Sequence, residues 1–118
     1  MRLITWRVLV AIGCATVAVL HSFDAQALSF EDIRGKWCGS TADDEFTEKT
    51  LRITFHSGSP ERTFKITGYE YTDLVITVHW IDANNRQVWT KYSEFSPDRR
   101  LMYQQRDTNS ARLEFRRC

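Results

Sequence analysis

The stretch Gly35-Lys36-Trp37-Cys38-Gly39 sets a tryptophan directly beside a cysteine, between two glycines. We expect a first strand to begin at Lys36, and successive side chains of a strand point to opposite faces. Trp37 and Cys38 therefore lie in different surroundings, and each needs its own partner from elsewhere in the chain. Those two partners decide how the first strand is held in the fold.

The first 27 residues are typical of an export signal. Arg2 and Arg7 carry positive charge, and the apolar run 8–20 is too short to span a bilayer. Ala25-Gln26-Ala27 supplies the small-x-small pattern that signal peptidases cut. We therefore expect residues 1–27 to be a signal peptide and the mature protein to be periplasmic or secreted.

Cleavage after Ala27 leaves residues 28–118, enough chain for a single β-barrel domain and for no second one. It also leaves no integral membrane segment. Two alternatives stay open. One is a lipoprotein anchored through Cys14, because Ala11-Ile12-Gly13-Cys14 partly resembles a lipobox, and the other is a retained membrane anchor.

The mature chain keeps two cysteines, Cys38 and Cys118, in a compartment that favours oxidation. We expect them to form a disulfide that closes a loop of roughly 80 residues. In the chain-entropy model such a bond stabilises a fold by about 4 kcal/mol. Two free thiols or a metal-binding pair are the alternatives.

The charge balance argues against nucleic acid as a partner. The chain has 16 basic and 15 acidic residues, and removing Arg2, Arg7 and Asp24 leaves 14 of each. Acidic residues dominate 28–85 and basic residues dominate 86–118. This distribution is typical of two solvated faces that attract each other.

A short helical turn capped by Ser29 precedes the first strand. Apolar and polar residues alternate in 51–55, as expected of a half-buried strand. A four-residue turn after this strand would set Phe55 opposite Phe64.

The next strand is apolar on both faces, so loop length must decide which face lies inside. A three-residue loop with Asn85 in the left-handed region sets Trp80 opposite Val88. A slip of one residue would exchange the two faces. The chosen register leaves His79 and Trp89 side by side on the outer surface.

Short strands and turns continue to the end of the chain, at spacings of roughly 8 to 12 residues. This pattern predicts an all-β fold, a small antiparallel up-and-down barrel of about seven to eight strands, with a sandwich as the alternative. The residues expected inside include Leu74, Leu101, Tyr103, Leu113 and Phe115.

The helical turn followed by Gly35-Lys36-Trp37, with an arginine-rich final strand, resembles the lipocalin and wider calycin pattern. The resemblance implies that Trp37 closes one end of the barrel and that Arg112 or Arg116 lies across its ring. The chain is shorter than a full lipocalin, and eight strands enclose little more than their own side chains.

The chain also resembles two groups of exported proteins. Trp37-Cys38-Gly39, the turn 94–98 and the ending Arg116-Arg117-Cys118 resemble a group of small exported proteins of Gram-negative bacteria without an assigned activity. The size, the barrel and a cysteine near each end are also similar to periplasmic inhibitors of lysozyme and of secreted proteases.

The mature chain shows no residue pattern typical of an enzyme. His56 and His79 lie on different strands, without a nucleophile, a phosphate loop or ligand spacing beside them. Asp43-Asp44-Glu45 lacks the spacing of a calcium loop and is interpreted as a solvated acidic loop. We therefore expect neither catalysis nor a cofactor or metal.

Two kinds of binding stay open. The aromatic-rich interior favours a small apolar ligand. The outer pair His79 and Trp89, together with Asp43, Asp44 and Glu45, would suit contact with a cationic envelope enzyme. We expect a monomeric, non-enzymatic binding protein of the lipocalin-like barrel type, with inhibition of a lysozyme or protease as the alternative.

Overall fold

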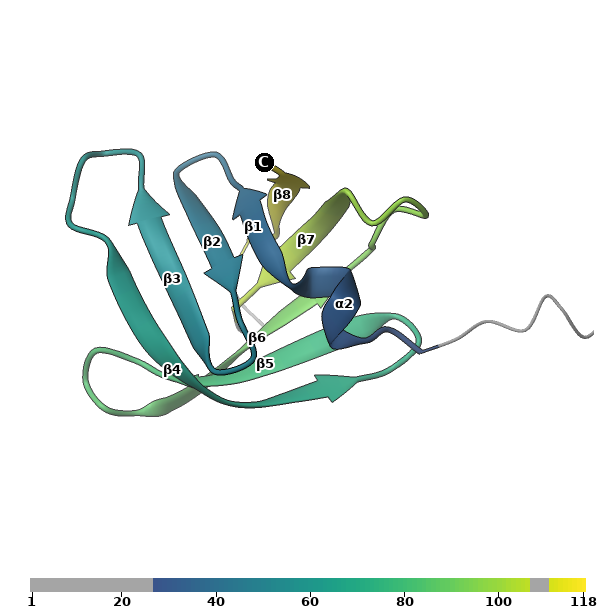
Figure 1. Ribbon diagram of the computed structural model, residues 1–118, viewed down its shortest axis with the longest axis horizontal. Helices are drawn as coiled ribbons and strands as arrows, with labels where there is room; N and C mark the ends of the chain where they lie inside the picture. The colour runs from purple at the N-terminus through teal and green to yellow at the C-terminus, as the bar shows by residue number, and fades with distance from the viewer. Residues whose placement is uncertain (1–26, 107–110) are drawn as a thin grey trace, which may run out of the picture.

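The chain forms a closed barrel of eight antiparallel strands in the computed structural model, which describes residues 27–106 and 111–118 (Figure 1). Each strand pairs with the next along the chain, and the last pairs with the first. The predicted all-β, up-and-down barrel with one short helical turn is confirmed. The elements are α2 (Phe30–Ile33), β1 (Gly35–Cys38), β2 (Ala42–Phe46), β3 (Thr50–Phe55), β4 (Arg62–Tyr71), β5 (Val75–Ile81), β6 (Gln87–Ser93), β7 (Leu101–Gln105) and β8 (Leu113–Arg117).

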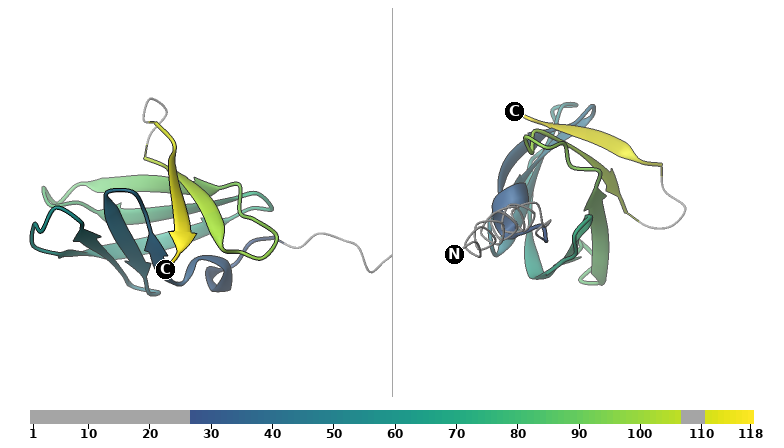
Figure 2. Two further views of the ribbon diagram at one scale, coloured as in Figure 1. Left: turned by 90° about the horizontal axis from the view of Figure 1, so that it is seen from above. Right: turned by 90° about the vertical axis from the view of Figure 1, so that its right-hand side faces the viewer.

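The connections between the strands lie alternately at the two ends of the barrel, as in any up-and-down barrel (Figure 2). Helix α2 and the connections 47–49, 72–74 and 94–100 lie at what we call the closed end. Residues 1–26 of the expected signal peptide, Cys14 among them, lie outside the described range. The other end, called the mouth, carries the connections 39–41, 56–61 and 82–86 and the one that leaves β7 at residue 106.

Every strand contributes at least one buried apolar side chain to a single core. The rings of Phe46 and Tyr92, from β2 and β6, meet edge to face with centroids 5.2 Å apart, so the core spans the barrel. Burial of each large apolar side chain stabilises the fold by about 1.5–3 kcal/mol. The core residues are Leu28, Ile33, Trp37, Phe46, Leu51, Ile53, Ile66, Ile76, Val78, Trp80, Tyr92, Met102 and Phe115.

The β5–β6 hairpin has the predicted register. Trp80 lies opposite Val88, and His79 lies opposite Trp89. Asn85 has φ 62°, in the left-handed region that the three-residue loop requires. Loop length and the alternation of β6 together fixed which face of β5 lies inside.

The predicted β3–β4 register is wrong by four residues. Leu51, rather than Phe55, lies opposite Phe64, and the pairing ends at Ile53 and Arg62. The connection between the strands is therefore longer than the predicted four-residue turn. Because the shift is even, the same residues of both strands still face inward.

Two residues expected inside are exposed. Leu74 belongs to the β4–β5 turn and is 75 % exposed, because β5 begins only at Val75. Leu113, the first residue of β8, is 40 % exposed. Both lie at strand ends, where alternation no longer determines burial.

The two faces of β7 are exchanged relative to the prediction. Met102 and Gln104 are buried, whereas Leu101 and Tyr103 are only half-buried. Gln104 is the register partner of Tyr92, which points into the core. The apolar run at the start of β7 hides the alternation, so the neighbouring strand decides the face.

The β1–β2 turn passes close to the last strand at Gly39. A Cβ atom there would lie 2.6 Å from the carbonyl oxygen of Ala42 and 2.7 Å from the ring of Phe115. The Gly39 amide donates a hydrogen bond to that same carbonyl over 3.0 Å. The turn therefore requires a residue without a side chain.

The first and last strands close the barrel along a seam. Trp37 and Cys38 of β1 are the register partners of Arg117 and Arg116 of β8. Cys38 and Cys118 form a disulfide with Cα atoms 5.1 Å apart, as the cysteine count predicted. The bond lies on the outside of the barrel, because the neighbouring Trp37 points inside.

Candidate functional site

Trp37 lies fully buried at the closed end. Its Nε1 donates a hydrogen bond of 2.8 Å to the carbonyl oxygen of Ile33, at the end of α2. The ring of Phe95 meets it edge-on, with centroids 6.3 Å apart. The indole is thereby enclosed by the helical turn and by the connection between β6 and β7.

The arginine that lies across Trp37 is Arg117. Its guanidinium carbon is 4.0 Å from the centroid of the Trp37 ring. Nη2 donates to the carbonyl of Asp32 over 3.1 Å, Nε donates to that of Arg99 over 3.3 Å, and Nη1 donates to that of Arg34. The guanidinium of Arg117 is partly removed from water, and this burial lowers its pKa from the ordinary value.

The expectation that Arg112 or Arg116 would cover Trp37 is wrong. Arg112 lies over the ring of Tyr103 at 4.6 Å, and Arg116 forms an exposed ion pair on the outer face. Side chains alternate along β8, so Arg117 shares the inward face of Phe115 and the other two arginines do not. The sequence contained this signal, since Phe115 was expected inside.

A hydrogen-bonded group of polar side chains crosses the barrel interior, and the sequence reasoning missed it. Gln104 Nε2, on β7, donates to Asp44 Oδ2 on β2 over 3.1 Å and to the hydroxyl of Tyr92 on β6 over 3.0 Å. Asp44 is 3 % exposed and Gln104 is 5 % exposed, while Tyr92 is fully buried. Three strands thus meet at one amide.

Burial raises the pKa of Asp44 from 3.8 to about 7. The positive charge of Arg106 and the hydrogen bond from Gln104 act in the opposite direction and are outweighed. Burial also raises the pKa of Tyr92 well above its usual value, which keeps its hydroxyl neutral. Asp44 therefore gains or loses its charge near neutral pH inside the barrel.

The expectation of a solvated acidic loop at Asp43, Asp44 and Glu45 is wrong, because these residues form most of β2. Asp44 points inward with Phe46, and its two neighbours point outward. Glu45 forms an ion pair with Arg52 of β3. The stretch thus offers one carboxyl group to the interior and two to the outer face.

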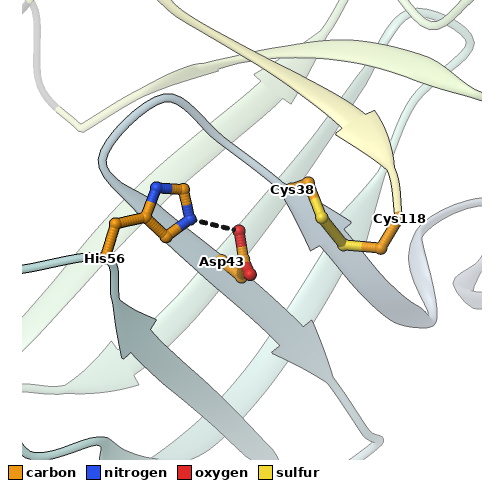
Figure 3. Close-up of a disulfide and its surroundings, with 4 residues drawn as sticks. All are labelled: Cys38, Asp43, His56 and Cys118. Atoms are coloured by element: carbon orange, nitrogen blue, oxygen red, sulfur yellow. Dashed lines mark hydrogen bonds and ion pairs between the residues drawn. A yellow bond between two sulfur atoms is a disulfide. The ribbon is translucent and has the colours of Figure 1, made fainter. Parts of the chain in front are cut away.

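Asp43 and His56 form a pair beside the disulfide (Figure 3). His56 Nε2 lies 2.8 Å from Asp43 Oδ1, and its Nδ1 lies 3.2 Å from the carbonyl oxygen of Ser40. The hydrogen bond to Asp43 raises the pKa of His56 above its ordinary value. The sulfur atoms of Cys38 and Cys118 lie on the other side of Asp43.

The mouth contains a depression of about 420 Å³ at the ends of β5 and β6, and its lining includes inward residues of both strands and the outer-face residue Trp89. Trp80, Val88 and Thr90 contribute to it, and Arg106 stands at its side. Trp80 Nε1 donates a hydrogen bond of 2.9 Å to Thr90 Oγ1, which fixes the indole. A neighbouring depression of about 280 Å³ shares Trp80 and Arg106, so the two form one grooved region.

A second depression, of about 440 Å³, lies at the closed end. Leu28, Leu74, Phe95 and Arg99 contribute to its lining. None of its lining residues belongs to the interior polar group of Asp44, Tyr92 and Gln104.

His79 and Trp89 lie side by side on the outer face, as predicted, and both are half-buried. His79 Nε2 is 3.3 Å from Glu70 Oε2, but the alignment is not that of a hydrogen bond. This buried nitrogen has no hydrogen-bond partner within the described part of the chain. Lys91 Nζ lies 5.3 Å from the centroid of the Trp89 ring.

Comparison of the chain with protein families, with curated proteins and with solved structures finds no match in any of the three. What the structure defines is a closed, eight-stranded antiparallel up-and-down barrel. None of the helical segments in 27–106 and 111–118 has the length and apolar character needed to cross a membrane.

Proposed function

We propose that the protein is an exported, non-enzymatic binding protein of the small lipocalin-like type, with its ligand site in the groove at the barrel mouth. The observation that carries this proposal is the depression of about 420 Å³ lined by Trp80, Val88, Thr90 and Arg106. Its volume falls within the range of about 300–1,000 Å³ that small-molecule sites occupy.

The two ends of the barrel support this position for the ligand. Trp37 and Arg117 cover the closed end, and the core cluster packs across the middle of the barrel. A guest that enters the barrel itself would therefore do so at the mouth, where the fixed indole of Trp80 offers a flat apolar wall.

The charges around the groove indicate the kind of ligand. The carboxylate of Asp82 accepts hydrogen bonds from the amides of Asn84 and Arg86 and from the Arg86 side chain. These bonds lower its pKa and keep it ionised, and the ion pair with Arg86 offsets its negative charge. Arg106, together with Arg62 in the adjoining depression, then supplies positive charge to the groove. A small, flat, mainly apolar molecule with an acidic group fits this arrangement.

Binding of 1-anilinonaphthalene-8-sulfonate, a flat apolar anion, tests the proposal when the dye is excited in its own absorption band. We expect saturable binding by the wild type and a loss of about tenfold or more in affinity for Val88→Trp, which fills the groove. Leu74→Ser, at the other depression, is the matched control and leaves the affinity unchanged. Loss of binding in Leu74→Ser and not in Val88→Trp would place the dye at the closed end and contradict the proposal.

Inhibition of an envelope enzyme such as a lysozyme or a protease is the second candidate, and one observation favours it. His79 and Trp89 form a half-exposed pair on the outer face. The acidic stretch supports it less than the sequence suggested, because Asp44 is buried and Glu45 is paired with Arg52. Capture of a lysozyme or protease from periplasmic extract, lost in His79→Ala and kept in Val88→Trp, would favour this candidate over the ligand site, because His79 does not line the groove and Trp89 does.

A further inference from the structure

We propose that reduction of the Cys38–Cys118 disulfide converts the outer seam of the barrel into a zinc site, with the two thiolates and the Asp43 carboxylate as protein ligands. His56 acts as the residue that positions Asp43. The site is separate from the groove at the mouth and does not depend on the function proposed for that groove.

The positions of the three ligand residues follow from the strand pairing. Cys38 on β1 and Asp43 on β2 are direct register partners, and Cys118 follows β8 on the other side of β1. The two sulfur atoms and a carboxylate oxygen of Asp43 all lie within 4.8 Å of one another. In the described residues this is the one group of three such ligand atoms that comes together.

These distances suit zinc once the sulfur atoms are no longer bonded to each other. Zinc binds thiolate sulfur at about 2.3 Å and carboxylate oxygen at about 2.0–2.2 Å in tetrahedral geometry, which places neighbouring ligand atoms about 3.3–3.8 Å apart. Rotation of the cysteine side chains supplies the remaining adjustment. Three protein ligands and one water complete four-coordination, as in open zinc sites.

His56 holds the Asp43 carboxylate from the side away from the sulfur atoms (Figure 3). Its Nε2 is 2.8 Å from Asp43 Oδ1, and the contact of its Nδ1 with the Ser40 carbonyl fixes the ring. Carboxylate ligands of metals are commonly held by such a second hydrogen-bonding partner, whose removal weakens metal binding by about 10–100-fold. The imidazole thus fixes the Asp43 carboxylate in a position from which one of its oxygens lies within 4.8 Å of both sulfur atoms.

The chemistry balances with a dithiol as reductant. Two electrons and two protons pass from the dithiol to the sulfur atoms, the S–S bond breaks, and the dithiol becomes a disulfide. Zinc then displaces the two thiol protons, which leave to solvent. Cys118 is exposed and Cys38 is half-buried, so both the reductant and the metal reach the sulfur atoms. The metal then joins β1 to β8 where the disulfide did.

Cobalt(II) titration of the reduced full-length mature chain, kept reduced by a phosphine, tests the inference. We expect one cobalt ion per chain with a thiolate-to-cobalt charge-transfer band, displaced by zinc, and no such band for the oxidised protein. Asp43→Asn weakens binding by about tenfold or more. Glu45→Gln, which removes a carboxylate from the same face of the same strand, leaves binding unchanged and is the matched control.

His56→Gln separates a positioning role from a structural one. We expect cobalt affinity to fall by about tenfold or more while the intensity of the charge-transfer band at saturation is kept, because both sulfur–metal bonds remain. Near-UV circular dichroism checks that each reduced chain is folded. Equal affinities for wild type and Asp43→Asn, absence of the charge-transfer band, or a reduced chain that stays unfolded with zinc present would each overturn the proposal.

Discussion

Trp37 and Arg117 face each other across the seam of the barrel, as register partners on β1 and β8 with the guanidinium 4.0 Å from the indole ring. The same guanidinium donates hydrogen bonds to the carbonyls of Asp32 in α2 and of Arg34 just after it. One side chain therefore joins the first strand, the last strand and the helical turn. Neither Arg112 nor Arg116 makes such contacts.

Replacing Arg117 by alanine should lower the free energy of unfolding by about 2–4 kcal/mol, because a contact with an aromatic face and charged hydrogen bonds to three backbone carbonyls are lost. Urea unfolding followed by tryptophan fluorescence measures the loss. Arg116→Ala is the control, since it removes only an exposed ion pair and should change stability by less than about 1 kcal/mol. Equal losses in the two variants would contradict the role given to Arg117.

The buried carboxyl of Asp44 should make stability fall as pH rises toward neutrality. Its pKa is raised from 3.8 to about 7 by burial, so the folded state binds more protons than the unfolded state between these values. The stabilisation is fully present below about pH 4 and is lost as pH rises through about 7. The loss is on the order of 4 kcal/mol.

Asp44→Asn isolates the contribution of Asp44 ionisation to stability, because the asparagine cannot ionise. Urea unfolding of both proteins at about pH 5 and about pH 8 should show a difference that grows in favour of the variant at the higher pH. His56, whose pKa is raised by its hydrogen bond to Asp43, remains in both proteins, so its contribution cancels. A difference in the free energy of unfolding between the two proteins that does not change with pH would contradict the raised pKa of Asp44.

Gly39→Ala should destabilise the protein by about 1–3 kcal/mol, because the new methyl group meets the Ala42 carbonyl and the Phe115 ring. Thermal unfolding measures the effect. Gly68→Ala is the matched control: a Cβ there meets nothing within 4 Å, so we expect a change of less than about 1 kcal/mol. A larger loss at Gly68 than at Gly39 would show that the close approach at the first hairpin is not limiting.

Replacing both Cys38 and Cys118 by serine should lower the free energy of unfolding by about 4 kcal/mol, since the bond closes a loop across a sequence separation of 80. Chemical unfolding without reductant compares the two proteins. Addition of a phosphine should bring the wild type, in metal-free buffer, to the stability of the variant. An unchanged unfolding midpoint in the variant would argue against a stabilising seam bond.

The β5–β6 hairpin shows what the sequence could determine. A strand apolar on both faces was placed correctly, because the loop at Asn85 and the clear alternation of β6 left one consistent register. The β3–β4 register was not determined in the same way. Shifting the β3–β4 pairing by an even number of residues leaves the same side chains facing inward. The alternation that identified both strands therefore fits Phe55 and Leu51 equally well as the partner of Phe64.

The interior polar group was missed because acidic residues are ordinarily solvated. Asp44 shares its face with Phe46, and that spacing was the available signal for an inward carboxyl. The hydrogen bond that compensates the burial of the Asp44 carboxyl comes from Gln104, which is 60 residues away in sequence. No local pattern predicts a hydrogen bond between strands that are not neighbours in the barrel, so the partner could be found only from the closed structure.

The seam also imposes an order on synthesis. Hairpins between consecutive strands form in about 1–10 μs once both strands are available. β1, in contrast, pairs with β8, and Cys38 waits for a partner 80 positions later. At about 5–20 residues per second, that delay is about 4–16 s. Until β8 is available, β1 has no strand on its outer edge, so the barrel can close only after the whole domain has emerged.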